Sequence, residues 1–166
     1  MEFRPDLSDL GGPTSANALV HRHFGVGDAV RAPDGSDGRF LVRGTWNTAI
    51  VAELTPDAAD IVVSKHRYSG FYGTDLDVIL RSRGIETLVF TGCTTSVCVE
   101  STLRDAFFHD YRCLLLADCV AEPIGAELAR SNHDATLLVT ELQFGWVADS
   151  AAFMTACAAP AVLSPA

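Results

Sequence analysis

Short apolar runs alternate with amphipathic stretches along the chain from about residue 38 onward. Runs rich in aliphatic and β-branched residues predict four strands, at 38–43, 60–65, 86–90 and 111–117. Apolar positions with helical spacing predict helices near 47–54, 74–83, 96–109, 124–142 and 149–158. The helix at 74–83 has the clearest boundaries, with Thr74 as its expected cap and Gly84 directly after it.

Strands that alternate with helices form βαβ units, in which neighbouring strands run parallel. The order of the elements therefore predicts an α/β fold with a mostly parallel sheet. Ligands of such folds bind outside the carboxyl ends of the strands. Three chemically capable positions follow predicted strands: Lys65, the segment 93–98 (CTTSVC) and Asp118. We therefore expect the functional site at this edge of the sheet.

The first 37 residues show a different pattern. They are rich in Gly, Pro, Asp and Ser, and only a weak helical patch at 16–23 interrupts them. The sequence therefore predicts three parts: an irregular, lid-like segment at 1–37, one domain at 38–158 and a flexible tail at 159–166.

Composition and charge narrow the classes of function. Of the 166 residues, 48% are hydrophobic and 20% are charged, as in a folded globular protein. The net charge is −9 and no Lys/Arg cluster occurs, so neither nucleic acid nor an anionic membrane is an expected partner. No apolar run is long enough to span a bilayer, and MEFRPDLSDL lacks the pattern of a signal peptide. With five cysteines that lack the spacing of a disulfide scaffold, we expect a cytoplasmic protein with free thiols.

Cys98 is the candidate nucleophile. It lies in the first turn of the helix predicted at 96–109, where unpaired backbone N–H groups and the helix dipole favour a thiolate. Backbone amides of the preceding segment 94–96 (TTS) can form an oxyanion hole at the same spot. Lys65, at the end of a neighbouring predicted strand, would add a positive charge that stabilises the thiolate. The alternative is that Cys98 is a small buried apolar residue, as many free cysteines are.

The remaining cysteines and histidines favour no metal site. The cysteine spacings C-x4-C and C-x5-C differ from the C-x2-C pairs typical of zinc sites and dithiol redox centres. His21 and His23 form a pair with no third ligand nearby in the sequence. The sequence therefore predicts neither a metal nor a cofactor.

Aromatic residues near the predicted strand ends suggest a small-molecule pocket. Tyr68 and Phe71 lie in the glycine-containing loop 65–76 (KHRYSGFYGTDL), and Trp46 lies in the segment GTWN. Each ring offers an apolar surface for a ligand, and we take these three as candidate substrate contacts. Ordinary packing over the sheet is the alternative for each of them.

Several motifs taken together resemble one known family. Lys65 followed by HRYSGFYGTDLDVILRSRGI, then LVFTGCTTSVCVESTLRDAF, with GTWN and FGWV, is similar to the isochorismatase-like cysteine hydrolases, most of all to their ureidoacrylate amidohydrolase branch. The resemblance runs from about residue 38 to about residue 150. It implies a Rossmann-like three-layer α/β/α fold with a mostly parallel sheet.

The resemblance also implies roles for individual residues. Cys98 becomes the nucleophile, Lys65 its electrostatic partner, and the backbone amides of Thr94 and Cys98 the oxyanion hole, with a cis peptide before Thr94. The implied reaction is attack on an amide or ureide carbonyl, release of ammonia or an amine, and hydrolysis of the thioester. A small amide or ureide as substrate, no metal and a homo-oligomeric state are further expectations from the family.

The chain departs from the family pattern at its N-terminus. Relatives carry a third catalytic residue, an aspartate at the end of their first strand, and this chain has no matching strand. MEFRPDLSDLGGP resembles instead the segment that follows the family's second strand. We therefore expect an N-terminally truncated version of the fold that lacks a strand–helix–strand unit of roughly 30 residues, with Met1 as an internal methionine.

Three functions remain open from the sequence. The leading one is a cysteine hydrolase that cleaves a C–N bond of a small amide or ureide. The second is a non-catalytic relative or incomplete fragment that acts in binding or subunit association. The third is hydrolysis of a vinyl ether of the isochorismate type, which needs no cysteine nucleophile.

Overall fold

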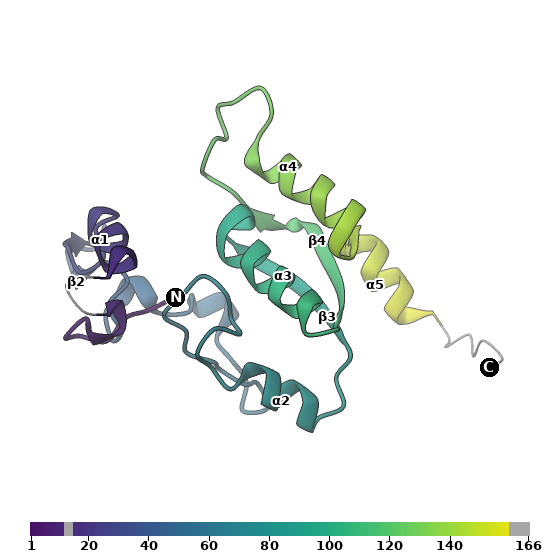
Figure 1. Ribbon diagram of the computed structural model, residues 1–166, viewed down its shortest axis with the longest axis horizontal. Helices are drawn as coiled ribbons and strands as arrows, with labels where there is room; N and C mark the ends of the chain where they lie inside the picture. Colours follow the sequence, from purple (N-terminus) through teal and green to yellow (C-terminus); the bar gives the residue numbers. More distant parts are fainter. Residues whose placement is uncertain (12–14, 160–166) are drawn as a thin grey trace. The chain divides into compact units, whose positions relative to one another are not determined.

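The computed structural model describes residues 1–11 and 15–159, and the chain forms two compact units. The first unit comprises residues 1–67 together with 72–74, and the second comprises 68–71 together with the chain from 75 onward. Figure 1 shows the elements of both units, coloured along the sequence. The predicted flexible tail, 159–166, lies outside the described residues except for Ala159.

The first unit consists of short elements around a small apolar core. They are η1 (Ser8–Leu10), α1 (Ala16–His23), β1 (Ala29–Arg31), β2 (Asp37–Arg39), η2 (Trp46–Thr48) and η3 (Ala52–Leu54), where η marks a single 3₁₀ or π turn. The strands β1 and β2 pair antiparallel. The buried side chains of Phe3, Leu10, Ala18 and Val26 form the core of this unit.

The segment 1–37, predicted to be irregular, thus contains a helix and most of a hairpin. The Ser15 hydroxyl caps α1 by accepting a hydrogen bond from the backbone N–H of Ala18 (3.4 Å). Gly35, with a φ of 87°, supplies the left-handed conformation in the turn between the strands. Because these elements are short and α1 buries only two residues, Ala18 and His21, their apolar periodicity is weak.

Residues 60–65 form no strand, contrary to prediction. The backbone N–H of Glu2 donates to the carbonyl oxygen of Lys65 (2.8 Å), and the side chains of Ile61 and Val62 are exposed. β-branched side chains favour an extended backbone, but a strand also requires a hydrogen-bonded neighbour along its length. The pattern DIVVSK therefore indicates an extended backbone, but it does not show whether a neighbouring strand is present to pair with it.

Two further predictions for the first unit were wrong in detail. Of the run 38–43, only the first two residues belong to a strand, β2, and its partner is the hairpin strand β1. The stretch 47–54 holds the last two residues of the 3₁₀ turn η2 and the whole of η3 in place of a helix. Eight residues with few intrahelical pairs rarely sustain a helix without tertiary packing.

The second unit is the α/β part of the chain. Its elements are α2 (Leu76–Ser82), β3 (Thr87–Cys93), η4 (Thr95–Val99), α3 (Glu100–Phe108), β4 (Arg112–Ala121), α4 (Asn132–Val139), η5 (Thr140–Phe144), β5 (Trp146–Ala148) and α5 (Ser150–Ala158). The strands form one parallel sheet in the order β3–β4–β5, and each strand is followed by a helix (Figure 1). This arrangement confirms the predicted α/β fold with a parallel sheet.

The core of the second unit lies where helices pack on this sheet. Leu103 and Ala106 share one face of α3 and, with Val99 at the end of η4, are buried against Phe90 of β3 and Leu115 of β4. Burial of a leucine side chain such as Leu103 or Leu115 contributes about 1.5–3 kcal/mol to folding. This packing fixes α3, and with it the turn that precedes it, relative to the sheet.

No helix in the described part of the chain has the length and apolar character needed to cross a bilayer.

Several element boundaries in the second unit differ from prediction, since β3 extends to Cys93 and β4 to Ala121, past the predicted ends at 90 and 117. The helix predicted at 96–109 begins with a π turn, η4, and that predicted at 124–142 begins only at Asn132, after a cap by the Ser131 hydroxyl. The three-residue strand β5 was not predicted, because so short a run shows no alternation. The helix α2 lies where expected, although Asp75 and not Thr74 occupies its N-cap.

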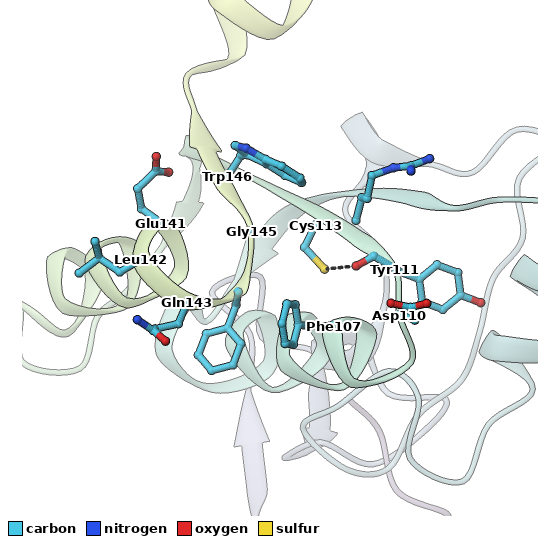
Figure 2. Close-up of a pocket in the computed structure, with 11 residues that line it drawn as sticks. Phe107, Asp110, Tyr111, Cys113, Glu141, Leu142, Gln143, Gly145 and Trp146 are labelled. Carbon is cyan, nitrogen blue, oxygen red and sulfur yellow. Dashed lines mark hydrogen bonds between the residues drawn. The ribbon is translucent and has the colours of Figure 1, made fainter. Parts of the chain in front are cut away.

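Gly145 lies at the junction of η5 and β5, directly beside β4 (Figure 2). A Cβ atom at this position would overlap the carbonyl oxygen of Cys113. Since backbone atoms cannot give way as a flexible side chain can, any larger residue must push β5 away from β4.

We predict that Gly145→Ala lowers the free energy of unfolding by about 2 kcal/mol or more, because of this overlap with the backbone. Urea unfolding followed by circular dichroism measures the change. Gly35→Ala is the matched control: its Cβ would meet nothing within 4 Å, and only the φ of 87° opposes it, at about 1–2 kcal/mol. A Gly145→Ala protein as stable as the parent would contradict the close approach of the two strands.

Candidate functional site

Cys98 lies in the turn η4, between the carboxyl end of β3 and the start of α3. The carbonyl oxygen of Thr94 accepts hydrogen bonds from the backbone N–H groups of Val97 (3.1 Å) and Val99 (3.2 Å), and these bonds close the turn. The peptide bond between Cys93 and Thr94 is cis, as the family resemblance implied. The Cys98 side chain is half-buried, so its thiol is neither locked in the core nor fully solvated.

Two side chains from other elements hold the first residues of this turn. The carboxylate of Glu122, just after β4, accepts a hydrogen bond from the backbone N–H of Ser96 (2.7 Å). The hydroxyl of Thr95, which is fully buried, lies 3.2 Å from Nδ1 of His133 on α4. One of the amides that the sequence offered for an oxyanion hole, that of Ser96, is therefore already paired with a carboxylate.

The Glu122 carboxyl is held in its charged form. Burial acts to raise its pKa, but hydrogen bonds from Ser96 and Ile124 and the nearby His133 outweigh this and keep the pKa below the ordinary value of 4.5. Its second oxygen accepts from the backbone N–H of Ile124 (2.9 Å). Both oxygens thus bind backbone groups, one in the turn and one in the segment after β4.

A third contact ties the turn to the segment 68–71. The Thr102 hydroxyl donates to the carbonyl oxygen of Cys98 (2.6 Å) and accepts from the backbone N–H of Gly70 (2.9 Å). A Cβ on Gly70 would lie 3.2 Å from side-chain atoms of both Thr102 and Leu76, so glycine permits this close approach. The part of the predicted loop that belongs to the second unit, 68–71, is therefore anchored next to the Cys98 turn.

The ring of Phe71 is buried in the core of the second unit. It stacks on His109 with ring centroids 5.2 Å apart and tilts against Tyr111 at 5.9 Å. Tyr68 is half-buried in the same segment. Contact of Tyr68 or Phe71 with a substrate stays a prediction, and for Phe71 the structure supplies the packing role that was its alternative.

Lys65 and Trp46 belong to the first unit, whereas Cys98 belongs to the second. The Lys65 ammonium donates to the carbonyl oxygen of Arg67 (3.0 Å). The Trp46 indole lies on β2, where a Cβ on Gly38 would approach its Nε1 to 2.6 Å. The predicted roles of Lys65 at the thiolate and of Trp46 at the substrate stay predictions.

Asp118 has a structural partner. β4 carries extra residues opposite β3, since Phe90 pairs with Leu115 and Gly92 with Val120, and Asp118 lies in this bulge. Its carboxylate accepts hydrogen bonds from the backbone N–H (2.8 Å) and the hydroxyl (2.6 Å) of Ser150, at the start of α5. These bonds hold the pKa of Asp118 below its ordinary value of 3.8.

The other four cysteines are free thiols that differ in their exposure. Burial raises the pKa of the Cys113 thiol to about 11, so this group stays protonated at neutral pH. Cys93 and Cys157 are exposed, and Cys119 is half-buried. Among the described residues, no three His, Cys, Asp or Glu side chains converge as metal ligands would.

A cleft of about 420 Å³ lies at the opposite end of the sheet, where β4 and β5 begin (Figure 2). Its walls include Phe107, Cys113 and Trp146. None of the predicted site residues lines it, and ligands of parallel sheets bind at the carboxyl ends of the strands. We therefore place the candidate site at the Cys98 turn and not in this cleft.

Sequence reasoning missed the residues that hold the turn: Glu122, His133 and Thr102. His133 falls within the helix predicted at 124–142, and Glu122 falls between that helix and the strand predicted at 111–117. Thr102 falls four residues after Cys98, and this i, i+4 spacing is the one indication that its hydroxyl can reach the Cys98 carbonyl.

Comparison with known proteins gives a consistent result. The model of the isochorismatase domain family matches residues 10–152. The ureidoacrylate amidohydrolase RutB of Methylobacterium radiotolerans is 46% identical over 156 residues, which are 94% of this chain and 58% of that protein. Among solved structures, an isochorismatase-like hydrolase from Alkaliphilus metalliredigens has a TM-score of 0.67 at 29% identity, covering 88% of this chain and 68% of the other. The N-carbamoylsarcosine amidase of Thermoplasma acidophilum has a TM-score of 0.59 at 37% identity, covering 68% and 61%.

The chain spans about 58% of the length of the curated relative from Methylobacterium radiotolerans. The activity and substrate of such a relative are therefore assigned to this chain only as a proposal.

The bond between Ser150 and Asp118 predicts a pH-dependent contribution to stability. Since the folded-state pKa of Asp118 is depressed, the contribution is complete above the ordinary value of 3.8 and is lost as the pH falls through the lower folded value. Ser150→Ala removes the hydroxyl donor, so the loss of stability should be largest at neutral pH and shrink in acid. Thermal unfolding of the parent protein and Ser150→Ala, from neutral pH into acid, measures the difference in stability between them.

Ser82→Ala is the matched control for this prediction. The Ser82 hydroxyl donates to the carbonyl oxygen of Ile79 (2.9 Å), which does not titrate, so the effect of the substitution should not depend on pH. A Ser150→Ala gap as wide in acid as at neutral pH would contradict the assigned partner.

Proposed function

Because the chain belongs to the isochorismatase domain family, we propose that it is a cysteine hydrolase that cleaves a C–N bond of a small amide or ureide. The observation that carries the proposal is the position of Cys98. Its half-buried thiol lies in the tightly closed turn between the carboxyl end of β3 and the start of α3. At such a position backbone N–H groups and the helix dipole stabilise a thiolate.

The proposed chemistry proceeds in two steps. The Cys98 Sγ attacks the carbonyl carbon of the substrate, the C–N bond breaks, and ammonia or an amine leaves with a proton, which produces a thioester. Water then attacks the thioester carbonyl, the C–S bond breaks, the carboxylic acid (a carbamic acid, from a ureide) leaves, and a proton from the water regenerates the thiol. Backbone amides of Thr94 and Cys98 are proposed to stabilise the negative charge on the carbonyl oxygen in both steps.

Further groups complete the proposed site. Lys65 would favour the Cys98 thiolate by its positive charge, and Tyr68, Phe71 and Trp46 are the proposed substrate contacts. The proposal uses no metal and no cofactor. A cytoplasmic location and a homo-oligomeric state are part of the same proposal, by analogy with the family.

The names of the relatives support a carbamoylated amine as substrate. One relative is named for ureidoacrylate and a structural neighbour for N-carbamoylsarcosine, and both names describe a carbamoyl group on an amine nitrogen. We therefore propose a ureide as the first class of compound to test, ahead of simple amides.

We predict that Cys98→Ser lowers the rate of ammonia release from ureidoacrylate or a simple N-carbamoyl amine on the order of a thousandfold or more, because the nucleophile is lost. Ammonia is measured in a coupled assay under saturating substrate. Cys157→Ser, which removes an exposed thiol on α5, is the control and should keep the parent activity.

The other outcomes separate the competing functions. Hydrolysis of a vinyl ether that survives Cys98→Ser would favour ether hydrolysis without a cysteine nucleophile. If the parent protein releases no ammonia from any ureide or amide, the proposal fails, and a binding or assembly role becomes the better hypothesis.

A further inference from the structure

We infer that Glu122 is a positioning residue for Cys98, and that its carboxylate holds the turn in which the thiol can react. The inference deepens the proposed function and rests on the role of Cys98 in it. Glu122 lies just after β4, 24 residues beyond Cys98 in the sequence.

The Glu122 carboxylate links the Cys98 turn to the segment after β4. Oε2 accepts from the backbone N–H of Ser96 at 2.7 Å, and Oε1 accepts from the backbone N–H of Ile124 at 2.9 Å. Ser96 precedes Cys98 by two residues within the same π turn. A charged acceptor on a backbone N–H makes a stronger bond than a neutral one, so this contact restrains the turn more firmly than an ordinary hydrogen bond.

The remaining contacts of the turn leave this restraint to Glu122. The Thr94 carbonyl takes the N–H groups of Val97 and Val99, which closes the turn but does not orient it relative to the sheet. The contact between Thr95 and His133 orients the preceding residue, and Thr102 holds the carbonyl side of Cys98. Of these groups, only Glu122 binds the N–H of Ser96, which lies near the start of the turn, on the side of β3.

The charge of Glu122 and its role as acceptor have opposite effects on Cys98. A nearby negative charge disfavours a thiolate, whereas an ordered turn directs its backbone N–H groups at the sulfur. The other ionisable groups on elements packed against the turn include His133 on α4 and Glu100 on α3. The Glu100 carboxylate is already paired with Arg104 and Thr136. A test must therefore separate the acceptor from the charge.

The pair Glu122→Gln and Glu122→Ala makes this separation. Both variants lose the charge, but glutamine keeps a side-chain oxygen that can accept from Ser96, and alanine does not. The experiment measures the rate of iodoacetamide alkylation of Cys98 in the native chain at fixed neutral pH, by peptide mass spectrometry. We expect alanine to react on the order of tenfold more slowly than glutamine.

Two references exclude a general loosening of the fold. Alkylation of the exposed Cys157 in the same samples should be equal in all variants. Glu141→Ala removes a carboxylate that accepts from the backbone N–H of Val147 (2.6 Å) at the other end of the sheet, and it should leave the Cys98 rate unchanged.

Each outcome bears on one claim. Equal Cys98 rates in the glutamine and alanine variants overturn the positioning role, and so does an equal slowing by Glu141→Ala. If the parent Cys98 reacts no faster than Cys157, the proposed nucleophile fails, while the ratio of the two Glu122 variants still decides whether Glu122 positions the turn.

Discussion

The hydrogen bonds that close and anchor the Cys98 turn are the interaction on which the candidate site depends. The turn is a π turn. Its hydrogen bonds differ from those of a regular α-helix, so some backbone groups of the turn pair with groups outside it. Here the Thr94 carbonyl, the Glu122 carboxylate and the Thr102 hydroxyl each bind a backbone group of the turn. These bonds fix a half-buried thiol at the start of a helix, and the proposed role of Cys98 as nucleophile depends on that position.

The parallel sheet explains why these groups meet. Since β3 and β4 run in the same direction, the turn after β3 and the segment after β4 emerge at the same edge, and Glu122 can reach Ser96 although 26 residues separate them. The buried face of α3, with Leu103 at its centre, then keeps the helix that follows the turn against the sheet. Fold and site are thus linked through one strand–turn–helix unit.

The sequence predicted those features that depend on local pattern. The strands at Phe90 and Leu115, the helix α2 and the place of Cys98 after a strand all follow from apolar periodicity and turn residues. The run around Val62 shows the limit, because its β-branched residues predict a strand only if a neighbouring strand is present to pair with it. Glu122 and His133 could not be found in this way, since their importance comes from contacts between segments far apart in the chain.

The most direct measurement is to trap the proposed thioester. The protein is mixed with a ureide or an activated amide, quenched in acid, and digested for mass spectrometry. The proposed mechanism predicts an added acyl or carbamoyl mass on the peptide that contains Cys98, absent from Cys98→Ser. Product formation without an adduct on Cys98, or an adduct on another cysteine such as Cys93, would contradict the assignment of the nucleophile.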